Sequence, residues 1–180
     1  GDEFVAKLDA YLKEHYDADE VDRTGEIPDE NLKGLAEMGC FAMKIPTKYN
    51  GLGLSQVNYN RALHLTGSIC GNLTALLSAH QSIGVPQPLL TFGTDEQKQK
   101  WLPQIAAGKK FVSVAVTEPN AGSDVAGLRV QAKKCEGGYK ITGEKTWCTF
   151  AGRADVFSLL ARTGTVESGW RGLTRFLVEK

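Results

Sequence analysis

Apolar residues in the first 110 positions recur at intervals of three and four, which is the spacing of one face of an α-helix. The pattern predicts helices over residues 4–12, 28–39, 55–71 and 94–108, and a helix or pair of helices over 73–92, interrupted around residues 84–86. Ser55 and Thr94 stand where N-caps belong, and Gln97 completes a capping box with Thr94. Residues 17–25 and 45–53 are polar or rich in Gly and Pro, so we expect loops there. The first part of the chain is therefore predicted to be all-helical.

Beyond Lys110 the apolar pattern becomes short and alternating, as in β-strands with one buried face. It predicts strands over residues 112–116, 128–134, 139–142, 156–161 and 173–178, and the Gly137–Gly138 pair predicts a hairpin turn. We expect an α+β chain: an all-helical domain over residues 1–110, then an incomplete, antiparallel β-barrel-like domain over 111–180. Because an apolar strand that ends the chain leaves an open edge, we also expect the chain to be part of a longer protein.

Composition excludes several classes of function. The 21 basic and 21 acidic side chains cancel, so we expect no nucleic-acid partner. Hydrophobic residues make up 42% and charged residues 23%, and no apolar run is long enough to cross a bilayer, so no membrane partner is expected either. The four cysteines lack the spacing of zinc ligands and are expected to be reduced thiols; no metal site is predicted.

Two short segments carry the chemistry of this sequence. In the first, an apolar run ends at Val116, and Thr117–Ser123 then supplies hydroxyls, a Pro–Asn corner and backbone amides. In the second, Trp147 and Thr149 place an indole beside a hydroxyl at the end of a strand-like run. Together these segments can form one wall of a pocket for a flat cofactor with polar edges. From the residues alone, an ordinary β-turn and a core Trp are the favoured interpretations.

Other candidates are weaker. The acids near these segments, among them Glu118, Asp124 and Glu144, are interpreted as ligands of backbone N–H groups rather than as general bases. His80 is interpreted as a packed helix residue. The chain contains no GxGxxG after a strand, no Walker-type loop and no GxSxG, which argues against dinucleotide-fold dehydrogenases, P-loop NTPases and serine hydrolases.

Several strings occur in a familiar order. They are Met38–Gly39 through Ile45–Pro46, Tyr49–Ser55, Phe92–Gln97 through Trp101–Pro103, Val116–Pro119 with Ala121–Asp124, Ile141–Gly143 with Lys145, Trp147 and Thr149, and Gly172–Thr174 through Phe176–Lys180. With these strings the chain resembles the acyl-CoA dehydrogenases, flavoproteins that desaturate acyl thioesters. The resemblance runs from about Leu32 to Lys180 and implies an N-terminal helical domain and part of a β middle domain. A C-terminal helical bundle, which completes the subunit in that family, is absent from this sequence.

The resemblance also implies roles for particular residues. It assigns FAD contacts to Val116, Thr117, Gly122, Ser123, Trp147, Cys148 and Thr149. Thr117 is expected to bond the pyrimidine side of the flavin, Ser123 also to touch the CoA arm of the substrate, and Thr149 to bond the N5 region. Cys148 departs from the usual aliphatic residue, so its backbone is expected to keep its role while its side chain alters packing. No catalytic residue is assigned in this chain, because the family's general base lies in a region that is not present.

The activity implied by the resemblance is FAD-dependent α,β-dehydrogenation of an acyl-CoA thioester, with hydride passing to flavin N5 and electrons to an electron-transfer flavoprotein. A homotetramer or dimer in the bacterial cytoplasm or the mitochondrial matrix is expected. Alternatives are an acyl-CoA oxidase or flavin monooxygenase of the same fold, or a truncated helical interaction module without enzymatic activity. Acyl chain length and branching are not readable from these residues.

Overall fold

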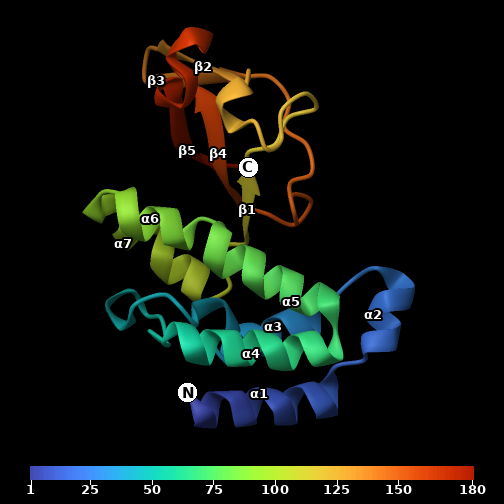
Figure 1. Ribbon diagram of the computed structural model, residues 1–180. Helices are drawn as coiled ribbons and strands as arrows, with labels where there is room; N and C mark the ends of the chain where they lie inside the picture. Colours follow the sequence, from blue (N-terminus) through green and yellow to red (C-terminus); the bar gives the residue numbers. More distant parts are fainter. The chain divides into compact units, whose positions relative to one another are not determined.

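The computed structural model describes the backbone of residues 1–180 and every side chain except that of Ile83. The chain divides into two compact units, Gly1–Phe111 and Val112–Lys180, which Figure 1 draws from blue through green and from olive through red. Within the described residues, no helix combines the length and apolar character needed to cross a membrane, and no cluster of potential metal ligands occurs.

The first unit is helical. Its elements are α1 (Asp2–His15), α2 (Ala18–Thr24), α3 (Asp29–Glu37), the 3₁₀ turns η1 (Cys40–Ala42) and η2 (Thr47–Tyr49), α4 (Gln56–Ile69), α5 (Gly71–Ser78), the π-turn η3 (Ala79–Ile83), α6 (Pro86–Phe92) and α7 (Asp95–Ala106). The Ser55 cap of α4 and the Thr94–Gln97 capping box of α7 are both formed, which confirms those predictions.

One prediction in this unit is wrong. Residues 17–25 were expected to be a loop, but they contain α2. The Asp17 side chain accepts the N–H of Glu20 at 2.9 Å, and Gly25 ends the helix in a left-handed conformation (φ 72°). These end groups cap the free backbone groups of a short helix. Because Val21 is its single buried residue, the sequence shows almost no apolar periodicity there.

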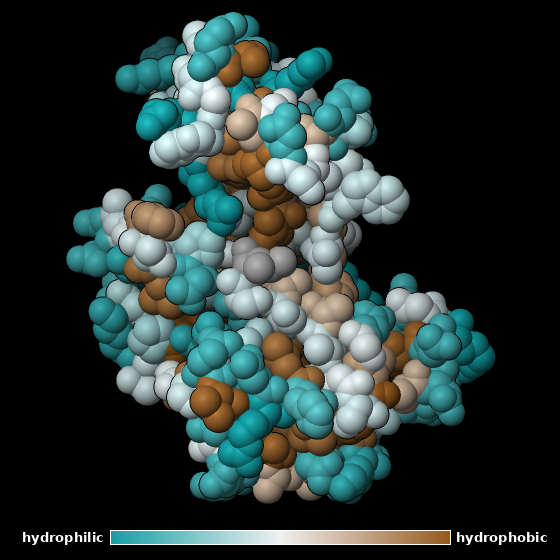
Figure 2. Space-filling model, in the orientation of Figure 1, coloured by the Kyte–Doolittle hydropathy of each residue, from teal (hydrophilic) through white to brown (hydrophobic). Residues whose placement is uncertain are grey.

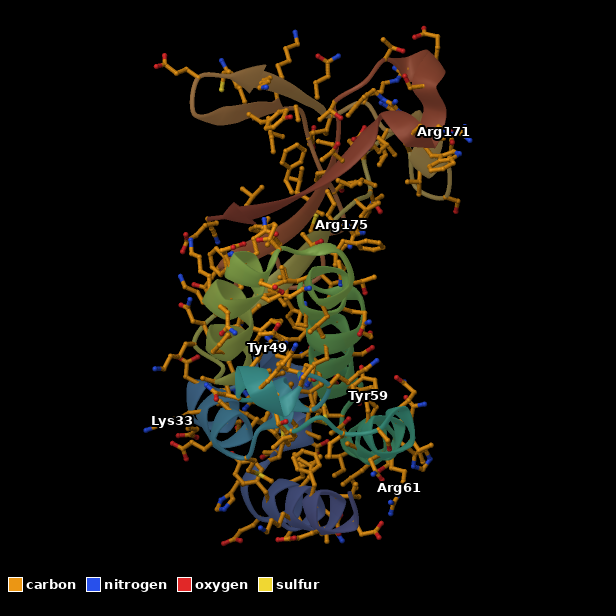
Figure 3. The ribbon with its side chains drawn as sticks, turned by 90° about the vertical axis from the view of Figure 1, so that its left-hand side faces the viewer. Lys33, Tyr49, Tyr59, Arg61, Arg171 and Arg175 are labelled. Carbon is orange, nitrogen blue, oxygen red and sulfur yellow. The ribbon has the colours of Figure 1, made fainter. Side chains whose placement is uncertain are left out.

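The helices enclose an apolar core with a few buried polar cross-links. Fully buried side chains come from α1, α3, α5, α7 and the η1 segment, and include Leu8, Leu12, Leu35, Phe41, Met43, Leu73, Leu77, Leu102 and Ile105. The buried Gln81 amide bonds the Cys40 carbonyl and accepts the Lys44 N–H at 2.9 Å, so it ties η3 to η1. An ion pair between Asp2 and Arg61, the latter labelled in Figure 3, joins α1 to α4 at the surface. On the face drawn in Figure 2, hydrophobic side chains lie singly or in small groups among hydrophilic ones.

The second unit is a five-stranded sheet. Its elements are β1 (Val112–Ala115), η4 (Val125–Gly127), β2 (Gln131–Cys135), β3 (Gly138–Thr142), β4 (Val156–Arg162), η5 (Val166–Gly172) and β5 (Leu173–Glu179). The strand order is β1-β4-β2-β3, with β5 paired to β4. The Gly137–Gly138 hairpin between β2 and β3 is confirmed, with both glycines at positive φ.

The expected sequence of a helical part followed by a β part is confirmed, but the sheet is mixed rather than antiparallel. β4 pairs in parallel with β1, from Val112 opposite Val156 to Ala115 opposite Leu159, and it meets β2 in parallel at a single position. Only the β2–β3 and β4–β5 pairs are antiparallel. A hairpin between consecutive strands is visible in a sequence, whereas the pairing of β1 with β4 joins residues 44 apart and has no local signal.

Candidate functional site

A tight turn follows β1. Glu118 and Ala121 exchange backbone hydrogen bonds of 2.9 and 3.1 Å around the Pro119–Asn120 corner. The Asp124 carboxylate then accepts the Gly127 N–H at 3.1 Å and starts η4, as expected of an acid that bonds backbone. The N–H groups of Gly122 and Ser123 take no part in these bonds, and both residues are exposed. The turn therefore offers two amides and a hydroxyl at the surface.

The Glu118 side chain points away from this surface and is only 7% exposed. Its two oxygens accept the N–H of Arg129 at 2.7 Å and of Val130 at 2.9 Å, and one of them also meets Lys145 Nζ at 2.8 Å. Burial alone raises the pKa of this carboxyl, but the hydrogen bonds from Lys145 and the two N–H groups outweigh it and hold the pKa below its usual range. Glu118 is thus a fixed anion that organises the start of β2, in agreement with its interpretation as a backbone ligand.

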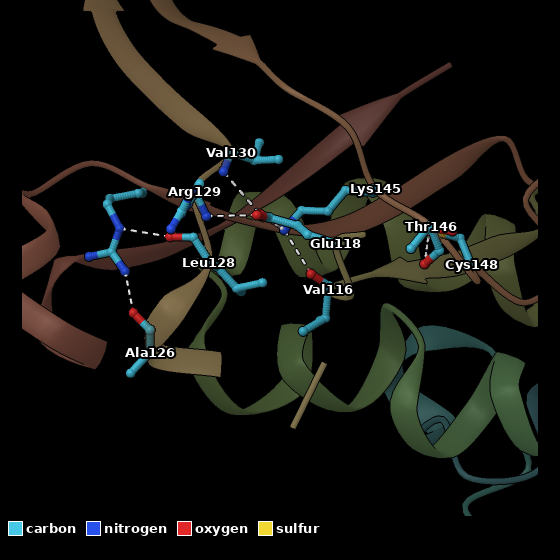
Figure 4. A network of polar contacts seen from close by, with 10 residues as sticks. Val116, Glu118, Ala126, Leu128, Arg129, Val130, Lys145, Thr146 and Cys148 are labelled. Carbon is cyan, nitrogen blue, oxygen red and sulfur yellow. Dashed lines mark hydrogen bonds and ion pairs between the residues drawn. The ribbon is translucent and has the colours of Figure 1, made fainter. Parts of the chain in front are cut away.

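The loop after β3 lies against this turn (Figure 4). Lys145 Nζ donates to the Val116 carbonyl at 2.7 Å as well as to Glu118, and the Thr146 N–H donates to the Thr117 carbonyl at 2.9 Å. A fourth bond, 2.6 Å long, runs from Ser113 Oγ in β1 to the Thr149 carbonyl. The structure therefore brings together the two segments that the sequence analysis singled out, at residues 116–118 and 145–149.

Trp147 is the most unusual residue of the loop. Its side chain is 88% exposed, and its backbone is left-handed (φ 55°), a conformation that is rare for bulky residues. Phe150, three residues later, is left-handed too (φ 59°). The expectation that Trp147–Thr149 ends a strand is wrong, because β3 stops at Thr142 and the segment is a loop. The alternative of a core Trp is also excluded within this unit.

Cys148 faces inward by comparison. It is partly buried, and its thiol donates to the Thr146 carbonyl at 3.6 Å. Burial raises the pKa of the Cys148 thiol, with the nearby Lys145 charge opposing that rise. Its side chain therefore belongs to the packing of the loop, whereas the residues on either side of it, Trp147 and Thr149, are exposed.

Sequence reasoning missed Arg162, the last residue of β4. Its guanidinium is 3% exposed and donates to the carbonyls of Leu128, Ala126, Thr165 and Gly169 at 2.6–3.1 Å. It thereby joins η4, which follows the turn, to η5. A basic residue at the end of an apolar strand was the only signal in the sequence, and it does not distinguish a buried cation from an exposed one.

His80 is a core residue of the helical unit, as predicted. It is 1% exposed and packs against Phe41 and Phe111, with ring centroids 5.0 and 6.1 Å away. Burial lowers the pKa of His80 to about 4, with the Lys110 backbone opposing the shift, so the imidazole is neutral at pH 7. A neutral ring among aromatic side chains has no access to a substrate in this unit.

Comparison with known proteins gives the family. The model of the acyl-CoA dehydrogenase N-terminal domain matches residues 2–109, and that of the middle domain matches residues 113–180. The chain therefore belongs to the acyl-CoA dehydrogenase family, whose members are oxidoreductases.

Individual relatives agree. "Probable acyl-CoA dehydrogenase FadE10" of Mycobacterium tuberculosis is 44% identical over 98% of this chain and 27% of its own length. The mitochondrial very long-chain specific acyl-CoA dehydrogenase of Mus musculus is 34% identical over 99% of this chain and 28% of its own. This chain thus spans about a quarter of the length of these curated relatives, which include bacterial and mitochondrial proteins.

Solved structures share the fold. Butyryl-CoA dehydrogenase from Megasphaera elsdenii aligns with a TM-score of 0.89 at 30% identity, over 99% of this chain and 48% of that one. An acyl-CoA dehydrogenase of Bacillus anthracis complexed with FAD aligns at 0.82 and 29%, over 99% and 30%. The prolyl acyl carrier protein oxidase AnaB aligns at 0.89 and 32%, over 99% and 48%.

Proposed function

We propose that the protein containing this chain is an FAD-dependent acyl-CoA dehydrogenase, and that the turn after β1 and the loop after β3 form one wall of its flavin site. The observation that carries the proposal is Trp147: an 88% exposed indole held in a left-handed backbone, in a loop that three hydrogen bonds fasten to the turn and a fourth fastens to β1. Strained, exposed residues of this kind are concentrated at ligand sites.

The residues present fit a flavin. Trp147 offers an open aromatic face of the kind on which a planar ring system stacks. At Gly122 an added Cβ would meet only Thr117 Cγ2, at 4.0 Å, so the fold itself does not require a glycine there. Gly122 thus lacks a side chain although internal packing does not require this. The missing side chain leaves the backbone open to the close approach of a ligand.

Each residue then has a role. Val116, Thr117, Gly122 and Ser123 bind FAD through backbone amides and hydroxyls; Ser123 also contacts the CoA arm; and Trp147, Cys148 and Thr149 line the ring. When bound, FAD supplies the acceptor for the hydride that leaves the acyl β-carbon and passes the electrons to an electron-transfer flavoprotein. This chain orients the cofactor, while the carboxylate that removes the α-proton comes from outside these 180 residues.

The finer points of the proposal are an acyl-CoA thioester as substrate, a homotetramer or dimer as the assembly, and the bacterial cytoplasm or mitochondrial matrix as the location. The names of the relatives and the two family domains support the substrate, and the bacterial and mitochondrial origins of the relatives support the location. We also propose that the two units are the N-terminal domain, ending near residue 110, and part of the middle domain.

The test uses the full-length protein. The purified enzyme is expected to show flavin absorbance and, without oxygen, to lose the oxidised flavin band when an acyl-CoA of suitable length is added, whereas the free acid of the same chain leaves the band unchanged. A protein that carries FAD but is bleached by no thioester, over a series of chain lengths and branch patterns, would contradict the proposal.

A second candidate is an oxidase of the same fold, which the likeness to AnaB favours. The same sample separates the two. After bleaching, an oxidase recovers its absorbance within seconds in air, whereas a dehydrogenase recovers slowly in air and rapidly with an artificial electron acceptor.

A further inference from the structure

The wall described above consists of two segments that are about 30 residues apart in sequence, and one side chain makes two of the hydrogen bonds that join them. Lys145 Nζ bonds the Val116 carbonyl at 2.7 Å and the Glu118 carboxylate at 2.8 Å. Both charged side chains are nearly buried, with 8% and 7% of their surfaces exposed. Glu118 is anchored in turn by the N–H groups of Arg129 and Val130. The ammonium group is therefore fixed in position from two directions (Figure 4).

The hydrogen bond from Lys145 to the Val116 carbonyl also fixes the direction of the Thr117 N–H group. A peptide unit is planar and trans, so the carbonyl of Val116 and the N–H of Thr117 point in opposite directions. By holding the carbonyl, Lys145 turns the Thr117 N–H away from itself. The Thr146 N–H holds the next carbonyl, that of Thr117, in the same way. Successive peptide planes of the turn are thus oriented by successive residues of the loop.

Stability alone does not explain a buried pair of this kind. Desolvating two charges offsets most of their attraction, and apolar residues of similar size commonly stabilise a fold as well or better. A pair that also holds a backbone carbonyl does what apolar residues cannot, because it sets the direction of a peptide group.

We propose that Lys145, fixed by Glu118, is a positioning residue for FAD: it aims the Thr117 N–H toward the cofactor and keeps the Trp147–Thr149 loop in register with the turn. The inference rests on the proposed function. It predicts that loss of Lys145 changes how the flavin is held and polarised, while contacts to the acyl chain remain.

The experiment uses the full-length enzyme, with Lys145→Met, Lys145→Arg, Glu118→Gln and a control. Leu159→Ala is the control, because it removes apolar packing from the same sheet without a polar bond to the wall. The Kd for FAD is measured by titrating apoenzyme, together with the absorption spectrum and midpoint potential of the bound flavin, and kcat and KM at saturating FAD.

Lys145→Met is expected to raise the Kd for FAD at least tenfold, to shift the flavin spectrum and potential, and to lower kcat with KM for acyl-CoA changed less than twofold. Lys145→Arg restores part of the affinity. Glu118→Gln gives a smaller loss, because Lys145 keeps the Val116 carbonyl, and it serves as the probe if Lys145→Met does not fold. Leu159→Ala lowers the melting temperature but keeps the wild-type spectrum and potential.

Two results overturn the inference. The first is a wild-type Kd, spectrum and potential in Lys145→Met and Glu118→Gln. The second is the same set of changes in Leu159→Ala as in the Lys145 variant, which would make the role purely structural. Either result leaves the proposed function standing if the wild-type protein binds FAD and is bleached by acyl-CoA, whereas a wild-type protein that binds no FAD refutes the function and the inference together.

Discussion

Replacing Trp147 tests whether the loop holds a strained backbone for the sake of a ligand. The side chain is 88% exposed, so its removal takes little from the packing of the β unit. Its backbone is left-handed (φ 55°), which glycine adopts freely and other residues do not. Trp147→Ala keeps the strain and removes the ring, whereas Trp147→Gly removes both. Comparing these two variants isolates the backbone contribution, because the side chain is absent from each.

The expected magnitudes follow from general values. A left-handed conformation costs a non-glycine residue about 1–2 kcal/mol. Glycine gives back about 0.5–1 kcal/mol through the greater freedom of its unfolded chain. Trp147→Gly should therefore be about 0.5–1 kcal/mol more stable than Trp147→Ala in the apo form. Loss of one stacking face should weaken FAD binding by about 1–3 kcal/mol in both, by analogy with aromatic stacking on bases.

The assay is urea unfolding of the full-length apoprotein, paired with FAD titration of each variant. Trp147→Phe, which retains an aromatic face, should lose less affinity than either. The reasoning fails if Trp147→Ala is as stable as Trp147→Gly, since the backbone would then carry no strain. It also fails if both variants lose about 3–5 kcal/mol, as a buried Trp would, or if the Kd for FAD is unchanged.

Three further predictions concern the supporting structure. The pKa of His80 is about 4 in the fold and about 6.5 in the unfolded chain, so the unfolded chain binds more protons between these pH values and the free energy of unfolding should fall by up to about 3 kcal/mol as pH drops from 6.5 to 4. Urea titrations at each pH should show that His80→Leu removes this pH dependence. Gly143→Ala should destabilise by about 1–3 kcal/mol in thermal unfolding, since φ is +136° and a Cβ would lie 2.7 Å from Val130 Cγ2; wild-type stability would show that the loop adjusts freely. Arg162→Met should cost about 3 kcal/mol by leaving one buried and three part-buried carbonyls at η4 and η5 without this donor, and faster amide exchange should appear in both turns; exchange confined to one of them would contradict the shared anchor.

Local signals explain what the sequence predicted well. Caps at Ser55 and Thr94 and the Gly137–Gly138 turn are determined by neighbours within a few residues, and all are found. α2 was missed because polar end groups rather than an apolar face define it. The parallel pairing of β1 with β4 was missed because nothing within either strand encodes a partner 44 residues away.

The candidate site divides in the same way. Its exposed members, such as Ser123 and Trp147, were identified from motif strings, but the strings carried no information on conformation. That Trp147 is left-handed and outside any strand follows from the loop's fastening to β1, which is a tertiary effect. Glu118 was correctly interpreted as a backbone ligand, yet its partner Lys145 could be recognised only once the loop after β3 was placed against the turn.

The distribution of burial within this site has a physical reason. Under the proposed function, a group that bonds the cofactor gives up contact with water rather than with a protein partner, which agrees with the exposure of Gly122, Ser123 and Trp147. Their positions must then be fixed by other groups, and these can be buried because they never meet the ligand. Glu118 and Lys145 meet that requirement: both are nearly buried, Glu118 accepts the backbone N–H groups of Arg129 and Val130, and Lys145 donates to the backbone carbonyl of Val116. Strain at Trp147 is the expected consequence, because the loop's conformation is set by these anchors and not by the preference of its own residues.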